Sequence, residues 1–392
     1  MKKNGLMKFS LLSISLVLTS SGAIAADIPA IAKAFPTQSV SSIQLLITIP
    51  GISVVIFVLL SSFISKILGE KQTVILGLFI ALFSSIIPIF SDNYTAILIS
   101  RIFLGVGFGL FNSLAVSLIG FFFDGYERTK LVGFQNAFQS IGLAVMTYLV
   151  GILININWHM TFCVYLIIIP IIIFFVFFVP STKRPENANE ETEKTKLKQT
   201  TNWHVILYLL IFVILLIISA PTNLDLALLF VHSGYGTATD ASTVLSIGSL
   251  VGMLAGFSFG VIFKKINHFV LPASFILTAL SLLLIAVSNN VLMASVGAVA
   301  ATFFGCFAMP YLFNQALNVS PKGSETLSVS LLLVGANIGG AISPYGIKLL
   351  SILSGTTKIN GIFVVSAIAF IILAIIFLIY VFKIRKSQSM PR

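Results

Sequence analysis

Twelve apolar stretches, arranged as six and six around one charged segment, constrain this chain of 392 residues more than any other feature. Most have about the 20 apolar residues that a helix needs to cross a hydrocarbon core of about 30 Å. Backbone groups find no water at that depth, so helices are expected, and residue-by-residue alternation is absent. The predicted spans are Phe9–Phe35, Ser41–Ser65, Thr73–Phe90, Tyr94–Phe123, Leu131–Ile154, Met160–Pro180, Trp203–Val231, Asp240–Phe263, Phe269–Ser288, Val291–Val319, Thr326–Ser354 and Ile359–Phe382.

Composition supports this prediction. Hydrophobic residues make up 57% of the chain and charged residues only 9%, which leaves too little polar surface to cover a soluble core. We therefore expect an all-α, multi-pass membrane protein with twelve transmembrane helices.

The distribution of positive charge predicts the orientation in the membrane. The net charge is +11, and 19 of the 23 Lys and Arg lie at the two ends of the chain or in connections expected on the same side as those ends. The opposite side holds only Lys33, Lys348 and Lys358. This asymmetry predicts that both termini are cytoplasmic in a cytoplasmic membrane, and it argues against a nucleic-acid partner.

The two halves of the sequence repeat. At a single offset of 198 residues, Asp27 aligns with Asp225, Lys66 with Lys264 and Glu127 with Glu325, and several glycines and serines align as well. Charged residues are rare here, so three charged pairs at one offset indicate a parallel repeat with a site between the halves. We predict an N-terminal half (1–180), a solvated cytoplasmic linker (181–202) and a C-terminal half (203–392).

Ionisable residues within spans are costly and are functional candidates for that reason. Asp27 and Arg101 lie at similar predicted depths, about 10–12 Å from the outer ends of their helices. They could pair, so that protonation of Asp27 would release Arg101 and couple a proton to a rearrangement; a static ion pair is the alternative. Lys348 lies near a span end, where its side chain can reach the interface.

A second group of residues is predicted to line a substrate cavity. Asp225 follows Pro221, which interrupts helical hydrogen bonding, so it lines either a cavity or a hydrated outer mouth. Uncharged polar side chains within spans could bind substrate or form hydrogen bonds between helices. The candidates for the cavity are Asp225, Asn112, Gln139, Asn314 and Asn337, with Gln44 and Thr48 among the other polar residues.

Glycines are concentrated in three spans and suggest sites of close packing or sliding between helices. On one span, Gly248, Gly252, Gly256 and Gly260 recur every four residues. The predicted packing and gating positions are Gly105, Gly107, Gly252, Gly256, Gly339 and Gly340.

The sequence has no recognisable enzyme signature. Its four histidines fall at span ends or in loops without metal-ligand spacing, and no P-loop is present. We therefore expect no enzymatic activity, no cofactor and no metal. Ala23–Ala25 resembles a signal-peptidase site, but the apolar run continues to Phe35, which favours a first transmembrane helix.

Three segments resemble motifs of the major facilitator superfamily, and the six-plus-six arrangement extends the resemblance over the whole chain. Arg101 to Gly107 resembles the family's Arg-x-x-x-Gly-x-Gly pattern, whose Arg is implicated in proton coupling. Glu127 to Gly133 resembles the Glu-Arg-x4-Gly turn, and Trp158 to Phe162 resembles Trp-Arg-x-x-Phe, with His159 in place of Arg. The resemblance implies two six-helix halves that rock around a central site.

The sequence also departs from the family patterns. In the loop between the second and third spans, Lys66 replaces the usual Asp and Glu70 replaces an Arg, while Gly69 and Lys71 are kept. The antiporter pattern Gly-x-x-x-Gly-Pro is absent from the fifth span, where only Gly142 and Gly151 remain.

The resemblance and the buried charges together predict a monomeric secondary transporter that moves a small molecule by alternating access. Proton-coupled export of an apolar or weakly cationic molecule is the first expectation. Proton-coupled uptake of a small organic solute or anion is the alternative, and a membrane sensor or scaffold without transport is a third. The expected partners are the substrate, protons and the lipid bilayer.

Overall fold

The computed structural model describes residues 2–181, 200–356 and 358–388, and within these ranges it is helical and contains no strand. Ten helical segments are long and apolar enough to cross a membrane, and a pair bent by 44°, Gly5–Leu16 with Ser20–Ala34, adds another. One of the ten, Ala238–Ala286, has 49 residues and would be about 73 Å long if straight. It reverses instead at Asn267, where φ is 50°, and forms two neighbouring spans. The described part of the chain therefore contains the twelve spans predicted.

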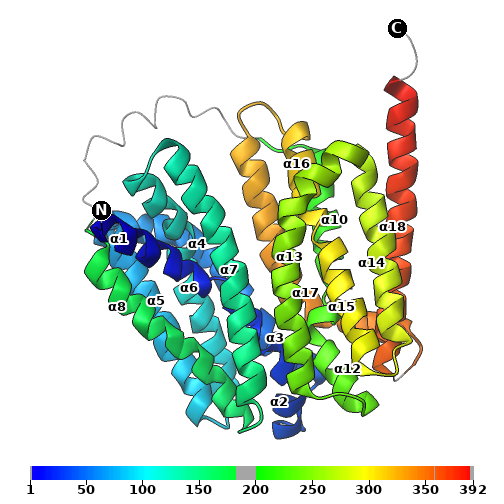
Figure 1. Cartoon of the computed structure of the whole chain (residues 1–392), viewed down its shortest axis with the longest axis horizontal. Helices are drawn as coiled ribbons and strands as arrows, with labels where there is room; N and C mark the ends of the chain where they lie inside the picture. The colour runs from blue at the N-terminus through cyan, green and yellow to red at the C-terminus, as the bar shows by residue number, and fades with distance from the viewer. Residues whose placement is uncertain (1, 182–199, 357, 389–392) are drawn as a thin grey trace.

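The first six spans form one bundle, shown from blue to green in Figure 1. In chain order its helices are α1 (Lys2–Ser13), η1 (Ile14–Leu16), η2 (Ser20–Asp27), α2 (Ile28–Ala34), α3 (Val40–Thr48), α4 (Pro50–Leu68), α5 (Glu70–Phe90), α6 (Tyr94–Phe122), α7 (Gly125–Leu153), η3 (Trp158–Ile167) and α8 (Ile168–Phe178).

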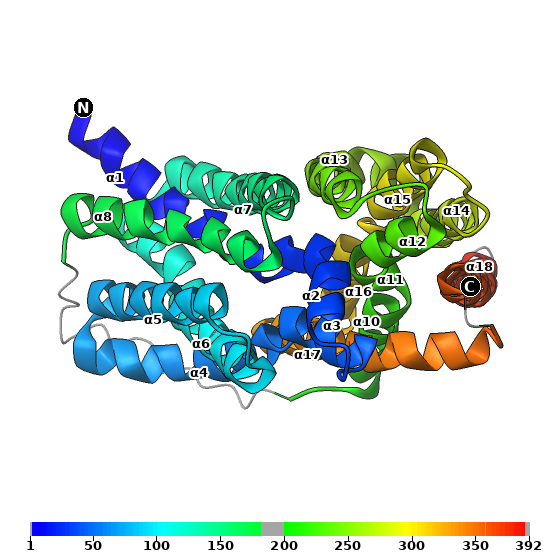
Figure 2. The same ribbon diagram turned by 90° about the horizontal axis from the view of Figure 1, so that it is seen from below.

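The last six spans form a second bundle beside the first (Figures 1 and 2). Its helices are α10 (Trp203–Ser219), α11 (Pro221–Leu224), α12 (Leu226–Ser233), α13 (Ala238–Ile266), η5 (Asn267–Phe269), α14 (Val270–Ala286), α15 (Val291–Gly305), α16 (Ala308–Val319), α17 (Glu325–Leu353) and α18 (Ile359–Gln388). Most of the predicted linker, residues 182–199, lies outside the described residues, so its role as a solvated connector stays a prediction.

Polar residues at the span ends set the helix boundaries. The Asn93 side chain accepts hydrogen bonds from the amides of Thr95 and Ala96 and caps α6, and Asn202 and Asn290 cap α10 and α15 in the same way. One of the larger boundary differences is at α7, which begins at Gly125 rather than at the predicted Leu131. Hydropathy alone missed its first turns, which are charged and exposed.

The sequence repeat has structural counterparts. Asp27 and Asp225 are 198 positions apart; Asp27 is the last residue of η2 and Asp225 directly follows α11, and each occupies the N-cap position of the next helix, α2 or α12. Glu127 and Glu325 both lie in the first turn of a helix, α7 or α17. The two bundles therefore use the same positions of the repeat to break or begin their helices.

The two bundles meet on the side opposite the linker. We call the side where α8 ends and α10 begins the linker face, and the other side the distal face. Thr239 Oγ1 near the start of α13 donates to Gly151 O near the end of α7 over 2.8 Å, at the distal face. Ser246 Oγ donates to Ala144 O over 2.7 Å. From these contacts the bundles diverge toward the linker face (Figure 1).

Candidate functional site

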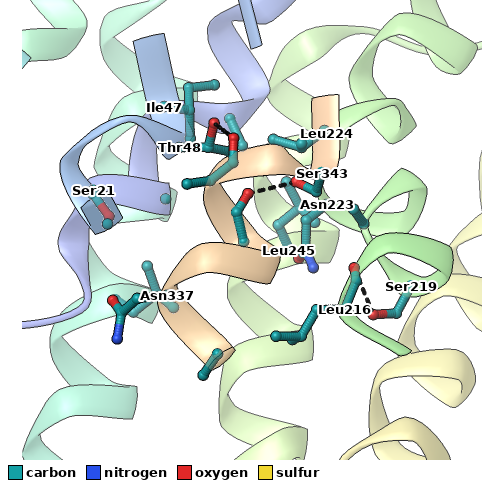
Figure 3. A pocket seen from close by; sticks show the side chains of 18 of the residues that line it. Ser21, Ile47, Thr48, Leu216, Ser219, Asn223, Leu224, Leu245, Asn337 and Ser343 are labelled. Carbon is teal, nitrogen blue, oxygen red and sulfur yellow. Dashed lines mark hydrogen bonds between the residues drawn. The ribbon is translucent and has the colours of Figure 1, made fainter. Parts of the chain in front are cut away.

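A cavity of about 380 Å³ lies between the two bundles (Figure 3). The cavity reaches the middle of the membrane-spanning helices, because one of its lining residues, Asn337, lies near the middle of α17. Its wall consists of Ser21, Gly22, Ala25, Ile47, Thr48, Gly51, Leu143, Thr147, Leu216, Ser219, Ala220, Asn223, Leu224, Leu245, Ser249, Ala336, Asn337, Gly340, Ala341 and Ser343.

The wall of this cavity follows the sequence repeat. Six pairs of lining residues are related by the offset of 198: Ser21 with Ser219, Gly22 with Ala220, Ala25 with Asn223, Ile47 with Leu245, Gly51 with Ser249, and Leu143 with Ala341. Corresponding positions of the two bundles thus line one cavity, as expected for a binding site shared between the halves of a parallel repeat.

The lining is uncharged and mixes apolar with polar side chains. Hydroxyl and amide side chains contribute the polar atoms, and no charged or aromatic residue is among the lining residues. The C-terminal bundle supplies most of them: Ser219, Asn223, Ser249, Asn337 and Ser343. A second cavity of about 300 Å³ shares Leu143, Asn223, Leu245 and Ser249 with the first, and its lining also lacks charged and aromatic residues.

A hydrogen bond between the bundles involves Asp225. This residue is 2% exposed, and Gln44 Nε2 of α3 donates to its Oδ1 over 2.6 Å. Asp225 Oδ2 and Gln44 Oε1 have no hydrogen-bond partner among the described residues. Asp225 therefore lies at neither of the sequence-predicted positions, a hydrated mouth or the cavity wall, because its side chain is buried at the contact between the bundles.

Arg101 stabilises the wall of the cavity from behind. Its Nε donates to Leu46 O over 2.9 Å, and its Nη2 donates to Ser21 O and to the Tyr165 hydroxyl over 3.3 and 3.1 Å. Its guanidinium carbon lies 5.2 Å from the centre of the Tyr165 ring and 5.7 Å from that of Phe162. These contacts tie segments of the first, second and sixth spans to the fourth.

Asp27 is fully buried but does not pair with Arg101. Its Oδ2 accepts a hydrogen bond of 2.7 Å from Thr161 Oγ1, one turn of η3 away from the Arg101 partner Tyr165. The ion pairs of the described residues are Lys8–Glu127 and His159–Asp92. In this structure the expected direct pair is thus replaced by contacts of both residues with the sixth span.

The other predicted cavity residues are distributed more widely. Asn337 lines the central cavity, whereas Asn112, Gln139 and Asn314 are not among its lining residues. Gln139 lies on α7 beside the first span, where its backbone carbonyl accepts from Thr19 Oγ1 over 3.4 Å. Sequence spacing identified polar residues within spans but did not determine the direction of each side chain.

The predicted packing glycines have two kinds of surroundings. A Cβ at Gly105 would collide with Pro50 O, and one at Gly107 would lie 2.5 Å from Gly77 O. A Cβ at Gly252 or Gly339 would lie 3.1–3.2 Å from its nearest neighbour, a tight contact. At Gly256 and Gly340 no heavy atom lies within 4 Å. The packing role remains a prediction for all six, with close approach seen at the first two.

The unusual loop between the second and third spans makes contacts of its own. Glu70 Oε1 accepts from Ser117 Oγ of α6 over 3.3 Å, and Lys71 Nζ donates to Val176 O of α8 over 2.8 Å. Glu70 thus contacts a hydroxyl at the position where the family pattern has an Arg.

A sequence profile described as Major Facilitator Superfamily matches residues 10–273, well over half of the chain. The chain belongs to this superfamily. Among curated protein sequences no match was found.

Solved structures of superfamily-like transporters have the same fold. The structure of a D-xylose-proton symporter aligns with a TM-score of 0.74 at 13% identity and covers 95% of this chain and 96% of the symporter. A peptide transporter aligns with a TM-score of 0.76 at 12% identity, covering 97% and 94%. The nucleoside transporter NupG aligns with a TM-score of 0.74 at 12% identity, covering 95% and 99%. Because the sequence identities are this low, the structural likeness shows only that the chain shares the fold of these proteins.

Several residues of the site were missed from the sequence alone. Ser219, Asn223, Ser249 and Ser343 line the cavity but are small polar residues that occur throughout the spans. The repeat contained a usable signal, because Ser21 and Ser219 align at the offset that also pairs Asp27 with Asp225. Adding 198 to the number of each residue near Asp27 would have led to Asn223 as well, because it corresponds to Ala25.

Proposed function

We propose that this protein is a proton-coupled secondary transporter that moves a small molecule through the central cavity by alternating access. The cavity is lined by corresponding positions of both bundles, so rocking one bundle against the other would expose it to each side in turn. The lack of a described folded region outside the spans favours transport over a sensor or scaffold. A monomer accounts for the whole cavity.

The hydrogen bond between Gln44 and Asp225 carries the proton-coupling part of the proposal. It joins the two bundles near the distal face, and no lysine, arginine or histidine forms an ion pair with Asp225 among the described residues. Burial opposes the charged form of a carboxyl group, and the single neutral donor, Gln44, offsets only part of that cost. Protonation of Asp225 would therefore stabilise the closed distal face, and loss of the proton would favour its opening.

Asp27 is the second proposed proton site. It occupies the repeat position of Asp225, but its hydrogen bond to Thr161 stays within one bundle. Arg101 acts beside it by holding the Ser21 backbone, which forms part of the cavity wall. Proton binding at Asp27 would thus change the first span and the wall without directly separating the bundles.

The charge asymmetry of the sequence supports an orientation with the linker face in the cytoplasm, in a cytoplasmic membrane. With that orientation, the structure is closed on the outer side. We propose export in exchange for protons as the direction of transport. Uptake by symport is the second candidate, because one of the structural neighbours is a D-xylose-proton symporter.

Vesicles of both orientations from overexpressing cells test the function and its direction. They receive a small-molecule extract of the host cells under an imposed pH gradient, and their contents are measured by mass spectrometry. Antiport would concentrate a solute in everted vesicles with an acidic interior. Symport would concentrate it in right-side-out vesicles placed in acidic medium. A protonophore should abolish either accumulation.

Asn substitutions at the two buried aspartates complete the test. We expect Asp225→Asn to lower gradient-driven accumulation by about tenfold or more, while solute exchange without a gradient persists. Asp124→Asn is the matched control, because Asp124 is exposed and its side chain makes no capping hydrogen bond. If neither the protonophore nor these substitutions changed the amount of solute accumulated, proton coupling would be ruled out.

A further inference from the structure

The central cavity has an electrostatic character that the sequence did not lead us to expect. Two acidic residues were expected to attract a cation, yet neither Asp27 nor Asp225 is among the lining residues. Both carboxylates are buried behind the wall, each with a neutral hydrogen-bond donor, Thr161 or Gln44. A charged ligand in the cavity would therefore lose water without gaining a counter-ion from the wall, which is costly in a low-dielectric site.

The polar groups of the wall are suited to a neutral ligand. The Ser219, Ser249 and Ser343 hydroxyls donate to helix carbonyls within their own spans, so their oxygens remain available to accept. Asn223 is exposed, and among the described residues its side chain makes no hydrogen bond within the protein, so the amide can both donate and accept. Such mixed donors and acceptors match alcohol or amide groups on a ligand.

The two sides of the cavity differ. At three of the paired positions the N-terminal bundle has Gly22, Ala25 and Gly51, where the C-terminal bundle has Ala220, Asn223 and Ser249. The first wall is therefore smaller and less polar than the second. A ligand would place its hydrogen-bonding edge toward the C-terminal bundle and its carbon skeleton toward the N-terminal bundle.

Size limits the ligand further. A water molecule has a share of about 30 Å³ in the liquid, so a cavity of about 380 Å³ holds on the order of a dozen non-hydrogen atoms. Two adjoining cavities at Asn223 offer space for a substituent without adding charge to the wall; one has no aromatic lining residue, and the other is lined in part by Phe212 and Phe370.

We propose that the transported molecule is a small neutral solute with several hydroxyl or amide groups, of about monosaccharide size, and that Asn223 and Asn337 are its principal hydrogen-bonding residues. Asn337 Nδ2 donates to Leu333 O over 2.9 Å, so Asn337 would contribute its Oδ1 as an acceptor. This inference rests on the transport function proposed above and replaces the expected apolar or cationic substrate. Ions and zwitterions find no counter-ion among the lining residues.

The vesicle assay with the host-cell extract also tests this inference. Every solute whose level depends on the protein is identified by mass and classified by its charge at neutral pH. A neutral, hydroxyl- or amide-bearing solute is expected. Transport of a charged solute would overturn the proposed substrate class while leaving the transport function intact. Absence of protein-dependent movement of any solute would overturn the transport function itself.

Substitutions in the wall link the solute to this cavity. For the solute identified, Asn223→Ala and Asn337→Ala should each raise KM by about tenfold, as expected for the loss of one well-placed hydrogen-bonding group. Asn112→Ala is the matched control, because Asn112 is an intramembrane amide that is not among the lining residues. An unchanged KM in both cavity variants would place the binding site elsewhere, and fluorescence-detected size exclusion would establish that each variant is folded.

Discussion

The two bundles share a repeat but use it differently. At one repeat position, Asp27 bonds within its own bundle and Asp225 bonds to the other bundle. At another, the N-terminal bundle has the buried Arg101 where the C-terminal bundle has Val299. The N-terminal bundle has thus acquired an internal polar network, while the C-terminal bundle supplies most of the polar cavity wall. One helical framework can therefore separate scaffold and binding functions by changing a few side chains.

The largest expected effect that tests this comparison is at Arg101. Arg101→Ala removes three hydrogen bonds that join four spans, and bonds to a charged group contribute about 1.5–3 kcal/mol each. The variant no longer has to bury a charged guanidinium, which offsets part of this loss. We therefore expect a net destabilisation of about 3 kcal/mol. Thermal unfolding in detergent measures it.

Val299→Ala is the matching change in the C-terminal bundle. It removes two methyl groups from a half-buried position and should cost about 1 kcal/mol. Equal decreases of Tm in the two variants would contradict the proposal that the N-terminal bundle, and not the C-terminal bundle, is stabilised at this repeat position by hydrogen bonds between its spans.

The next prediction compares the partners of the two aspartates. Gln44→Ala removes the donor to Asp225 and should shift the equilibrium toward distal opening by about tenfold, equivalent to about 1.4 kcal/mol. Thr161→Ala removes the donor to Asp27 and should lower stability without moving that equilibrium. Distances between spin labels on the distal ends of α7 and α13 report the opening. A similar opening in both variants would refute the distinction.

The smallest expected effect concerns a neutral contact between the bundles. Thr239→Val preserves the shape of the side chain but removes the hydrogen bond to Gly151 O, worth about 1 kcal/mol. The same spin-label distances should show opening by up to about fivefold, and the change should not depend on pH. A pH-dependent response would mean that the distal contact has a titrating group besides Asp225.

The sequence predicted the features that depend on composition and periodicity. Twelve spans, most of their boundaries to within a few residues, and the repeat follow from apolar length and from rare charged residues. It could not predict which way Asp225, Gln139 or Asn112 points, because helix rotation depends on packing against neighbouring spans. The cavity serines were missed for a related reason, since a serine in a span usually bonds to its own helix and has no distinctive pattern.

Gly256 and Gly260 of α13 have a consequence for the interpretation of natural variants. Glycine weakens a helix by about 1 kcal/mol relative to alanine, yet neither position has a neighbour within 4 Å here. An added methyl group at either position would leave this conformation intact, and a screen that scores only folding or abundance would classify the alanine variant as harmless. If α13 packs closely at these positions in another conformation, the defect would appear only as slower turnover, so variants on this strip should be judged by transport rates.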